Sequence, residues 1–295
     1  MTATTPGGIV TRNRGWTARL AARTGGGVLQ LILIIVALLW LLPTFGLLVE
    51  SLRDATQYTN GGWWQAIVHP AQLTFQNYQA LLQNSTMRTG FLNTVLITVP
   101  ATILVVLIGS AAGYAFAWMP FPGRDAIFLV VVGLLVIPIQ IALIPVVKLY
   151  GVLGLTGSLL SVILFHVAFG LPFAIFLLRN YFAGIPKDLM EAARIDGAGE
   201  GRLFFSVILP LGMPAIASLG IFQFLWVWND LLVALVFSNT SSQPITVALA
   251  SQTRQFGSSI DVLAPGAFLS LVVPLIVFLG FQRYFVQGVM AGSVK

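Results

Sequence analysis

Cysteine is absent from the 295 residues, and charged residues make up only 8% of them. Without cysteine the chain has no disulfide, no thiolate metal ligand and no cysteine nucleophile. An ordinary soluble domain carries roughly 25% charged residues. Here 57% of the residues are hydrophobic, which is more apolar surface than a soluble fold of this length can hide behind a polar exterior. The composition therefore indicates a protein that is solvated largely by the lipid bilayer.

A dense block of lysine and arginine is also missing, although the formal net charge is +6. Nucleic-acid binding requires a basic patch, commonly with interleaved aromatic side chains. The sequence contains no such segment. Basic residues at lipid headgroups explain the positive balance better. We therefore predict membrane lipid, and not nucleic acid, as a partner.

Long apolar runs predict an all-α integral membrane protein with six transmembrane helices. A spanning helix needs roughly 20 mostly apolar residues. The polar stretch 238–244 is a loop signal, so we expect the fifth helix to pass through Asp230 and to stop near Phe237. The six runs lie between Arg23 and Glu50, Arg88 and Arg124, Asp125 and Lys148, Lys148 and Arg179, Arg202 and Asp230, and Asp261 and Arg283.

The distribution of lysine and arginine predicts the orientation, because these residues accumulate in cytoplasmic loops. Six spans place both termini on one side of the membrane. If that side is the cytoplasm, four basic residues lie outside, namely Arg53, Arg88, Lys148 and Arg254. Eleven then lie inside: Arg12, Arg14, Arg19, Arg23, Arg124, Arg179, Lys187, Arg194, Arg202, Arg283 and Lys295. We therefore predict that both termini are cytoplasmic.

The predicted spans also give the domain boundaries. The apolar stretch Val28 to Val49 is too long for the core of a secretory signal, and no A-x-A site follows it, so it is read as an uncleaved first span. The expected parts are a cytoplasmic N-terminal tail (1–26), a six-helix transmembrane domain (27–285) with its core at about 88–284 and an inner loop at 180–210, and a cytoplasmic C-terminal tail (286–295).

The inner loop contains a short helix with both ends marked in the sequence. Pro186 suits the first helical position, and Asp188 lies in the first turn, where the helix dipole favours an acid. Gly197 is placed to end the helix in a left-handed conformation. Such a helix has three fates, which are to lie on headgroups, to pack on its own bundle or to dock into another protein. Its predicted apolar side consists of Leu189, Ala192, Ala193 and Ile195.

The same loop resembles the EAA motif of ABC importer permeases. Glu191-Ala192-Ala193 is followed after three residues by Gly197, and after nine more by Val207-Ile208-Leu209-Pro210. Val207 replaces the isoleucine that is usual in the family. The resemblance implies the ABC type-1 importer permease fold, in which this segment is the coupling helix and sits in a cleft of the ATPase subunit. Glu191, Ala192, Ala193 and Gly197 would then transmit motion to and from the ATPase.

Further segments resemble the MalG-type permeases of carbohydrate importers, over about residues 28–295. They are Leu73–Leu82, Phe91–Thr94, Phe121–Arg124, Trp228–Asp230 and the ending Gln282–Lys295. Within that group the chain is similar to α-glucoside permeases, in Phe169–Ile175, Leu178–Tyr181 and Phe222–Phe237. The resemblance implies import of a sugar, such as an α-glucoside di- or oligosaccharide, across the cytoplasmic membrane of a prokaryote.

The resemblance also implies the partners of this chain. They are a second permease subunit, an ABC ATPase dimer and an extracytoplasmic sugar-binding protein. ATP and Mg²⁺ would bind to the ATPase, and the permease itself would carry no cofactor, no metal and no catalytic residue. The chain contains no G-x-x-x-x-G-K-[ST] phosphate-binding motif, which agrees with that division of labour. Transport would proceed by alternating access around a site near the middle of the membrane.

Asp230 is the one acid deep inside a predicted span, and Trp226, Trp228 and Asn229 accompany it. An acid within a membrane is costly and marks a candidate functional site. These four residues form a candidate substrate pathway, because aromatic rings beside polar groups suit sugars. The alternative is that Asp230 lies near the outer end of its helix or is satisfied by hydrogen bonds. His166, in the fourth span, is expected to be a hydrogen-bonded packing residue.

Two rival functions remain to be weighed. An intramembrane protease needs a serine elbow, paired aspartates or a zinc motif. The segment 109–113 is not G-x-S-x-G, only one aspartate lies in a span, and H-E-x-x-H is absent. The other alternative is a channel or an ion-driven secondary carrier, and the single buried acid and the absence of an evident repeat disfavour a proton- or sodium-coupled machine. Purification distinguishes the two transporter classes, because a carrier is active alone whereas an importer permease is active only with its partner subunits.

Overall fold

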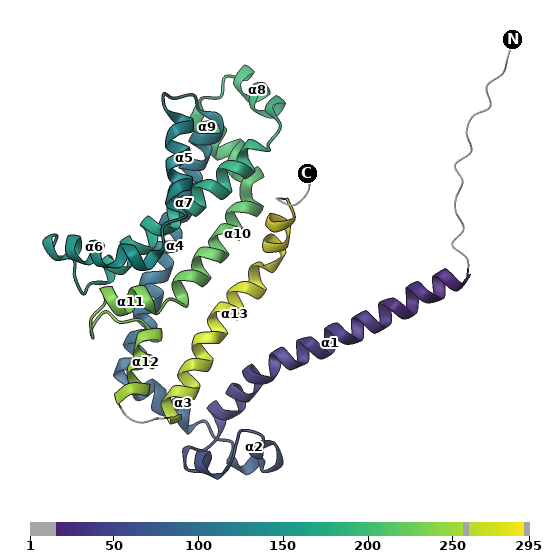
Figure 1. Ribbon diagram of the computed structural model, residues 1–295, viewed down its shortest axis with the longest axis vertical. Coiled ribbons are helices and arrows are strands. Elements are labelled where there is room, and N and C mark those ends of the chain that lie inside the picture. Colours follow the sequence, from purple (N-terminus) through teal and green to yellow (C-terminus); the bar gives the residue numbers. More distant parts are fainter. Residues whose placement is uncertain (1–15, 256–259, 292–295) are drawn as a thin grey trace.

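Helices are the main secondary structure in the part of the chain that the structure describes (Figure 1). The computed structural model describes the backbone of residues 16–255 and 260–291, and the side chains of residues 27–58, 60–252 and 261–283. β-Structure in these ranges is limited to two isolated bridges, Arg53 with Leu73 and Gly157 with Ser238. The predicted all-α class is confirmed.

Five helical stretches among the described residues are long and apolar enough to cross a membrane. They belong to α1 (Trp16–Leu52), α4 (Ser85–Trp118), α7 (Leu159–Ala183), α10 (Leu209–Trp228) and α13 (Ile260–Ala291). A sixth candidate is the bent pair α5 (Arg124–Leu134) and α6 (Ile139–Val152), whose axes meet at 101°. The predicted six spans are present when this pair counts as one.

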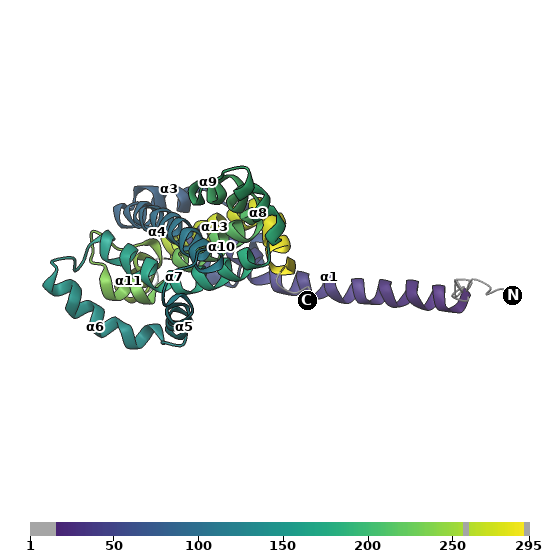
Figure 2. The same ribbon diagram turned by 90° about the horizontal axis from the view of Figure 1, so that it is seen from above.

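The prediction of a regular third span between Asp125 and Lys148 is wrong in its shape. The chain breaks at 135–138, where Pro138 has extended backbone (φ −62°, ψ 131°). Proline has no N–H to donate and disfavours helical geometry in the residue before it. After the break α6 projects sideways from the bundle (Figures 1 and 2). Lys148 consequently lies within α6 instead of in a loop.

The fifth predicted helix is also interrupted. α10 ends at Trp228, and the short α11 (Leu232–Phe237) follows after a break that contains Asp230. The prediction that one helix passes through Asp230 is therefore wrong, although the end near Phe237 is correct. α12 (Ile245–Gln255) then leads towards α13.

Close packing of α4 on α7 forms the centre of the bundle. A Cβ placed on Gly109 would lie 2.7 Å from the Cβ of Ala174, and one on Gly113 would lie 3.0 Å from the Cβ of Leu178. The two glycines are one turn apart, which is the small-x-x-x-small spacing that lets membrane helices approach closely. Segment 109–113, which does not match the serine-elbow motif, therefore forms part of the contact between α4 and α7.

The two ends of the bundle carry different polar elements (Figure 1). One end, the outer one in the predicted orientation, holds a cap (the outer cap) built from η1 (Ala55–Asn60), α2 (Gln65–Val68), η2 (Pro70–Gln72) and α3 (Gln76–Gln83). The fully buried Arg53 holds this cap together, because its guanidinium donates to Gln57 O, Gly61 O and Gln72 Oε1 at 2.6–2.9 Å. The other end holds α8 (Lys187–Ile195), α9 (Glu200–Leu203) and the π-helical η3 (Phe204–Ile208).

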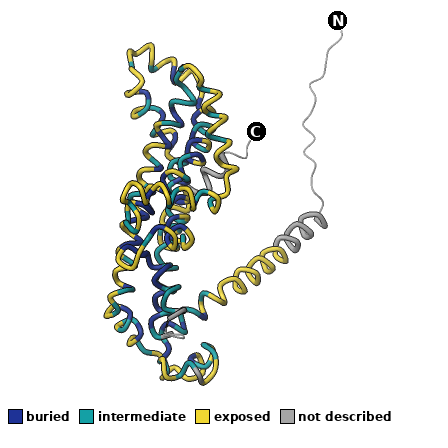
Figure 3. The backbone as a smooth tube through the Cα atoms, turned by 60° about the vertical axis from the view of Figure 1, so that its left-hand side comes forward, coloured by how far each residue is buried: buried dark blue, intermediate teal, exposed yellow. Residues whose placement is uncertain are grey.

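α1 stands apart from the bundle over most of its length (Figure 2). Its described side chains are mostly exposed (Figure 3), and Trp40 is 80% exposed. The helix begins at Trp16, so residues 16–26 of the predicted N-terminal tail are helical, while residues 1–15 lie outside the described residues. At the other end α13 continues to Ala291. The predicted C-terminal tail is therefore helical up to that residue, and 292–295 are not described.

Candidate functional site

The helix predicted in the inner loop is α8, and its end is built as the sequence indicated. Asp188 lies in its first turn. Gly197 has φ +79°, and its N–H donates to Arg194 O while the N–H of Ala198 donates to Ala193 O, each at 3.0 Å. These two bonds form a Schellman motif, which needs a left-handed residue at this position. The predicted C-cap is confirmed, whereas Pro186 is one position earlier than predicted, at the N-cap.

Only one side chain of α8 is buried, and it is Met190, which is 0% exposed and belongs to the main core cluster. The predicted apolar side of the helix points elsewhere. Leu189 is 46% exposed and Ile195 is 86% exposed, Glu191 and Ala192 are exposed, and Ala193 is half-buried. Of the predicted apolar side, only Ala193 packs against the bundle, and the rest is exposed. The motif residues Glu191 and Ala192 face outwards.

A polar link that sequence reasoning missed connects α8 to the long helix α4. Glu200, the first residue of α9, accepts a hydrogen bond from the hydroxyl of Tyr114 in α4. Its other carboxylate oxygen lies 3.1 Å from Nη2 of Arg194 in α8. The only local signal was an acid at the start of a helix, which the helix dipole favours. Nothing in the sequence indicated that Tyr114, 86 residues earlier, is its partner.

The π-helical turn η3 occupies the second half of the motif. The N–H of Leu209 donates to Phe204 O, five residues back. Pro210 follows in the first turn of α10 and has no N–H of its own. A wider turn before a proline relieves the clash of its ring with the preceding carbonyl groups. Leu203 and Ile208 are fully buried, so this irregular segment is packed against the core.

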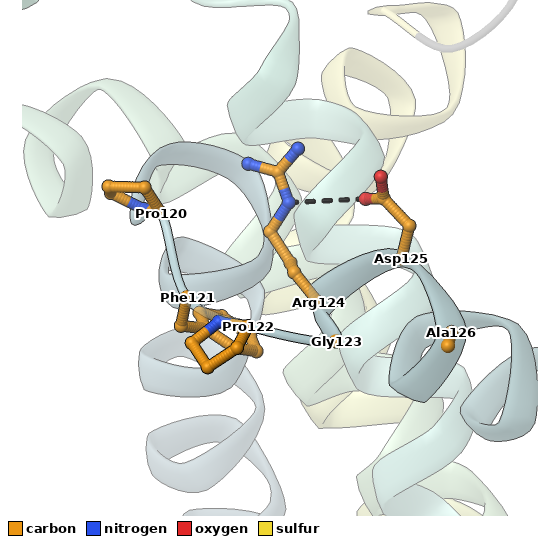
Figure 4. Close-up of a pocket in the computed structure, with 7 residues that line it drawn as sticks. All are labelled: Pro120, Phe121, Pro122, Gly123, Arg124, Asp125 and Ala126. Carbon is orange, nitrogen blue, oxygen red and sulfur yellow. Dashed lines mark hydrogen bonds and ion pairs between the residues drawn. The ribbon is translucent and has the colours of Figure 1, made fainter.

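The turn between α4 and α5 lies at the same end of the molecule as α8 and α9 (Figure 1). Gly123 has φ +77° and precedes Arg124, the first residue of α5. Figure 4 shows Arg124 directed towards Asp125, with Nε 3.2 Å from Oδ1. Pro120 to Ala126 line an open hollow of about 600 Å³ here. The Phe121–Arg124 segment thus forms the tight reversal between two helices and exposes polar groups at this end.

Asp230 lies at the break between α10 and α11 and caps the second of these helices. Its carboxylate accepts from the N–H of Val233 at 3.3 Å and of Ala234 at 2.9 Å. These are unpaired donors in the first turn of a helix, and Asp230 satisfies them from one residue before the N-cap Leu231. Thr246 Oγ1 donates to the carbonyl of Asp230 at 2.6 Å. The acid is therefore held by hydrogen bonds within this chain.

The four residues of the candidate substrate pathway do not converge on one cavity. The Asn229 amide donates back to Leu225 O at 2.8 Å. Trp228 is buried, and its Nε1 donates to Ser270 O in α13 at 2.9 Å. Trp226 lines an open cavity beside Phe169 and Phe222, whereas Asp230 lines a narrow hollow beside Thr94 and His166.

His166 is fully buried and packs at the edge of Trp226, with 5.0 Å between the ring centroids. Its predicted packing role is confirmed. The predicted hydrogen bond is wrong, because neither ring nitrogen has a hydrogen-bond partner among the described residues. Its Nε2 lies 3.5 Å from the carboxylate of Asp230. The two groups form an ion pair only when the imidazole ring is protonated.

Comparison with known proteins identifies the family. A family described as "binding-protein-dependent transport system inner membrane component" matches residues 105–290. Over 272 residues the chain is 48% identical to an osmoprotective compounds uptake permease protein of Synechocystis sp., covering 90% of this chain and 91% of that protein. It is 46% identical over 233 residues to an alpha-glucoside transport system permease protein of Rhizobium meliloti, covering 77% of this chain and 61% of that protein.

A solved structure has the same architecture. It is the crystal structure of a bacterial ABC transporter involved in the import of alginate, with a TM-score of 0.73 at 22% identity, covering 93% of this chain and all of that one. The chain therefore belongs to the family of binding-protein-dependent transport system inner membrane components. It is a permease subunit of an ABC transport system, a multi-pass inner-membrane protein and not an enzyme. The resemblance drawn from the EAA and MalG-type motifs is confirmed.

Proposed function

We propose that this permease imports an α-glucoside, of di- or oligosaccharide size, and that α8 couples transport to a separate ATPase dimer. The observation that carries the coupling role is the exposure of α8. Met190 anchors the helix, while Glu191 and Ala192 face outwards at one end of the bundle. A helix that packs on its own bundle through one side and is solvent-exposed on the other can insert into a cleft of another protein.

Each motif residue has a physical task in this proposal. The Glu191 carboxylate pairs with a basic residue of the ATPase, which gives a charge-assisted contact. Ala192 and Ala193 are small enough for close approach, and Gly197 allows the sharp exit of the chain. Motion of α8 then reaches the bundle along two routes, through Met190 into the core and through Glu200 to Tyr114. ATP and Mg²⁺ belong to the ATPase, and this chain supplies none of their ligands.

The other partners follow from the same proposal. A second permease subunit forms the other half of the pathway, and the two subunits rock about a site near midmembrane. An extracytoplasmic binding protein delivers the sugar to the outer cap, which the buried Arg53 keeps rigid. Both termini and α8 are cytoplasmic.

The substrate class rests on the relatives. One relative, 46% identical, is an alpha-glucoside transport permease protein, which agrees with the α-glucoside-like segments of this sequence. A second candidate is the uptake of a small osmoprotective solute, because another relative, 48% identical, takes up osmoprotective compounds. Direct measurement of substrate preference separates the two.

The test is reconstitution of this chain with the ATPase, second permease and binding protein encoded beside it. We expect ATP-dependent uptake of labelled maltose, trehalose or sucrose into proteoliposomes, and none of glycine betaine, an osmoprotectant without a sugar ring. Glu191→Ala should lower uptake about tenfold or more, since it removes a buried interface contact. Asp188→Asn, which changes another exposed acid of α8, is the matched control. Uptake of betaine alone would favour the osmoprotectant function, and ATP-independent transport by the isolated chain would refute an importer.

A further inference from the structure

Arg179 lies near the end of α7, and no acidic side chain of the described residues neutralises its charge. Its Nη1 donates to Oδ1 of the exposed Asn180 at 3.1 Å. Its Nε has no hydrogen-bond partner in the described part of the chain. The guanidinium Cζ lies 4.8 Å from the ring centroid of Phe128 in α5, which is a cation–π contact. Arg179 is therefore a positioned cation that has donors left for an anion.

Phe128 belongs to an aromatic cluster that joins α4, α5 and α7. Its ring centroid lies 5.6 Å from that of Phe116 in α4 and 6.5 Å from that of Phe176 in α7. Phe116 in turn lies 5.6 Å from Phe121, in the turn between α4 and α5. Each ring fixes a neighbour through such contacts. The position of the Arg179 guanidinium is therefore supported by all three helices.

Arg124 brings a second guanidinium to the same end of α5. It precedes Phe128 by four residues, which places both on one face of the helix. Its Nε lies 3.2 Å from Oδ1 of Asp125, whose side chain is 86% exposed. An ion pair this open to solvent is weak, so an anion can compete with Asp125 for the guanidinium. The open hollow at 120–126 leaves Arg124 accessible (Figure 4).

An apolar groove between α5 and α7 leads from Arg179 towards the bilayer centre. Phe176, Pro172 and Ala168 follow Arg179 along one face of α7, at steps of three, four and four residues. Pro172 and Ala168 line an apolar cavity of about 170 Å³ at the break between α5 and α6. The full lining is Leu134, Leu135, Ile137, Ala168, Phe169 and Pro172.

The dimensions of this groove match one leaflet of a bilayer. Arg179 lies about 30 Å from Leu159 along α7, at 1.5 Å per residue, and the hydrocarbon core is roughly 30 Å thick. Arg179 is therefore at headgroup level, on the cytoplasmic side in the predicted orientation. Ala168 lies about 16 Å from Arg179, and one leaflet contributes about 15 Å of hydrocarbon.

We infer that the groove between α5 and α7 is a binding site for an anionic phospholipid. The phosphate lies between Arg179 and Arg124, and one acyl chain follows α7 to the apolar cavity. Basic pockets between membrane helices on the cytoplasmic side bind anionic headgroups, and anionic lipids are concentrated in that leaflet. A soluble phosphate would use the two guanidiniums but not the apolar groove. The inference goes beyond the proposed function and does not depend on which solute is carried.

The test is native mass spectrometry of the complete, detergent-purified transporter, titrated with dioleoyl-phosphatidylglycerol. We expect the parent to retain this lipid more tightly than zwitterionic dioleoyl-phosphatidylcholine. Arg179→Gln should weaken retention of phosphatidylglycerol about tenfold, because a charge-assisted contact is lost. Arg202→Gln, which removes another exposed cation at the same end of the molecule, is the matched control and should stay within about twofold of the parent.

A second variant tests the acyl chain separately from the phosphate. Ala168 is exposed, so Ala168→Trp fills the groove without disturbing the core and should also weaken retention of phosphatidylglycerol. Glycerol 3-phosphate, which has no acyl chain, should not displace the lipid at equal concentration. Displacement by glycerol 3-phosphate together with parent-like binding in Ala168→Trp would assign the arginines to a soluble phosphate and overturn the lipid site.

Two further outcomes would overturn the site altogether. One is parent-like retention of phosphatidylglycerol in Arg179→Gln, or equal retention of the two lipids by the parent. The other is that no lipid is retained and that Asn180→Cys, placed in a chain without cysteine, is protected from maleimide in the complete transporter. That result would give the groove to the second permease subunit. None of these measurements requires sugar uptake, so a failure of the proposed function would leave the test intact.

Discussion

Gly197 is the residue whose conformation most directly determines the shape of the coupling segment. Its φ of +79° is in the left-handed region, and a Cβ there would meet no atom within 4 Å. Gly197→Ala therefore carries a backbone cost of about 1–2 kcal/mol and no steric one. We expect amide hydrogen exchange over 187–200 to accelerate about 5–30-fold, the factor that corresponds to this free energy.

The control for that prediction lies four residues further along the chain. Gly201 is inside α9, and an added Cβ there also meets nothing within 4 Å. Gly201→Ala should slow exchange or leave it unchanged, because alanine is the better helix former. Equal acceleration in both variants would show that any added methyl group disturbs the loop, and would contradict the left-handed cap as the cause.

Asp230 shows what single residues reveal without a structure. Its cost inside an apolar run marked a special position. The hydrogen bonds of its carboxylate agree with the alternative offered from the sequence, and contact with a sugar stays a prediction. An aspartate directly before the apolar segment 231–237 is also a signal for a helix start, and in the structure its carboxylate accepts from two N–H groups in the first turn of α11. This signal was local and could have been read from the sequence. The proximity of His166 to Asp230, 64 residues later in the chain, could not.

Among the helices, the contact between α4 and α7 depends on the absence of side chains. We predict that Gly109→Ala destabilises the protein by about 1–3 kcal/mol, because its Cβ would lie 2.7 Å from that of Ala174. Thermal unfolding of the detergent-purified complex measures this loss. Gly133→Ala in α5, where nothing lies within 4 Å, should cause no loss. The double variant Gly109→Ala with Ala174→Gly should recover part of it, and a failure to recover would argue against direct contact.

The link between α8 and α4 is testable as a pair. Tyr114→Phe and Glu200→Leu should each loosen α8 by about 1–2 kcal/mol, because each removes the charge-assisted hydrogen bond between the two residues. The double variant should cost little more than the larger single change, since both remove the same bond. Hydrogen exchange of α8 and the ATP hydrolysed per sugar provide the two readouts.

The neighbouring ion pair supplies the contrast. Arg194 and Glu200 are 40% and 44% exposed, and exposed pairs contribute roughly 0–1 kcal/mol. Arg194→Gln should therefore leave α8 nearly unchanged. If Arg194→Gln loosened α8 as much as Tyr114→Phe, the exposed ion pair and not the tyrosine would be the main connection.

The ends of some helices could be predicted from the sequence, whereas the packing and bending of helices could not. The ends of α8 depend on its own proline, aspartate and glycine, so local signals were sufficient, with an error of one residue at Pro186. Which of its faces is buried depends on the bundle, and the sequence did not single out Met190, the one buried side chain of α8. The 101° bend between α5 and α6 likewise depends on neighbouring helices and was not predicted. A proline in a membrane helix permits a bend, but packing of the neighbouring helices decides its size.

In the molecule as a whole, two elements leave the bundle with apolar surfaces uncovered. α1 stands away from the other helices, and α6 projects on the opposite side (Figure 2). In α6, Ile141, Ile144 and Val152 are 67%, 68% and 87% exposed. Such surfaces are stable only in lipid or against another subunit. The isolated chain is therefore an incomplete unit, which agrees with its membership of a family of transporter subunits.

The orientation of this unit follows from charge and can be measured because the chain has no cysteine. Asn60 is exposed in the outer cap, and Asp125, whose side chain is 86% exposed, follows the opposite end of α4. α4 has 34 residues and spans about 51 Å, enough to cross the membrane once. We predict that a membrane-impermeant maleimide labels Asn60→Cys in spheroplasts and Asp125→Cys only in inverted vesicles, with the parent chain as the unlabelled control. The reverse pattern would place α8 outside, where no ATP is available, and both sites reacting from one side would mean that α4 does not cross.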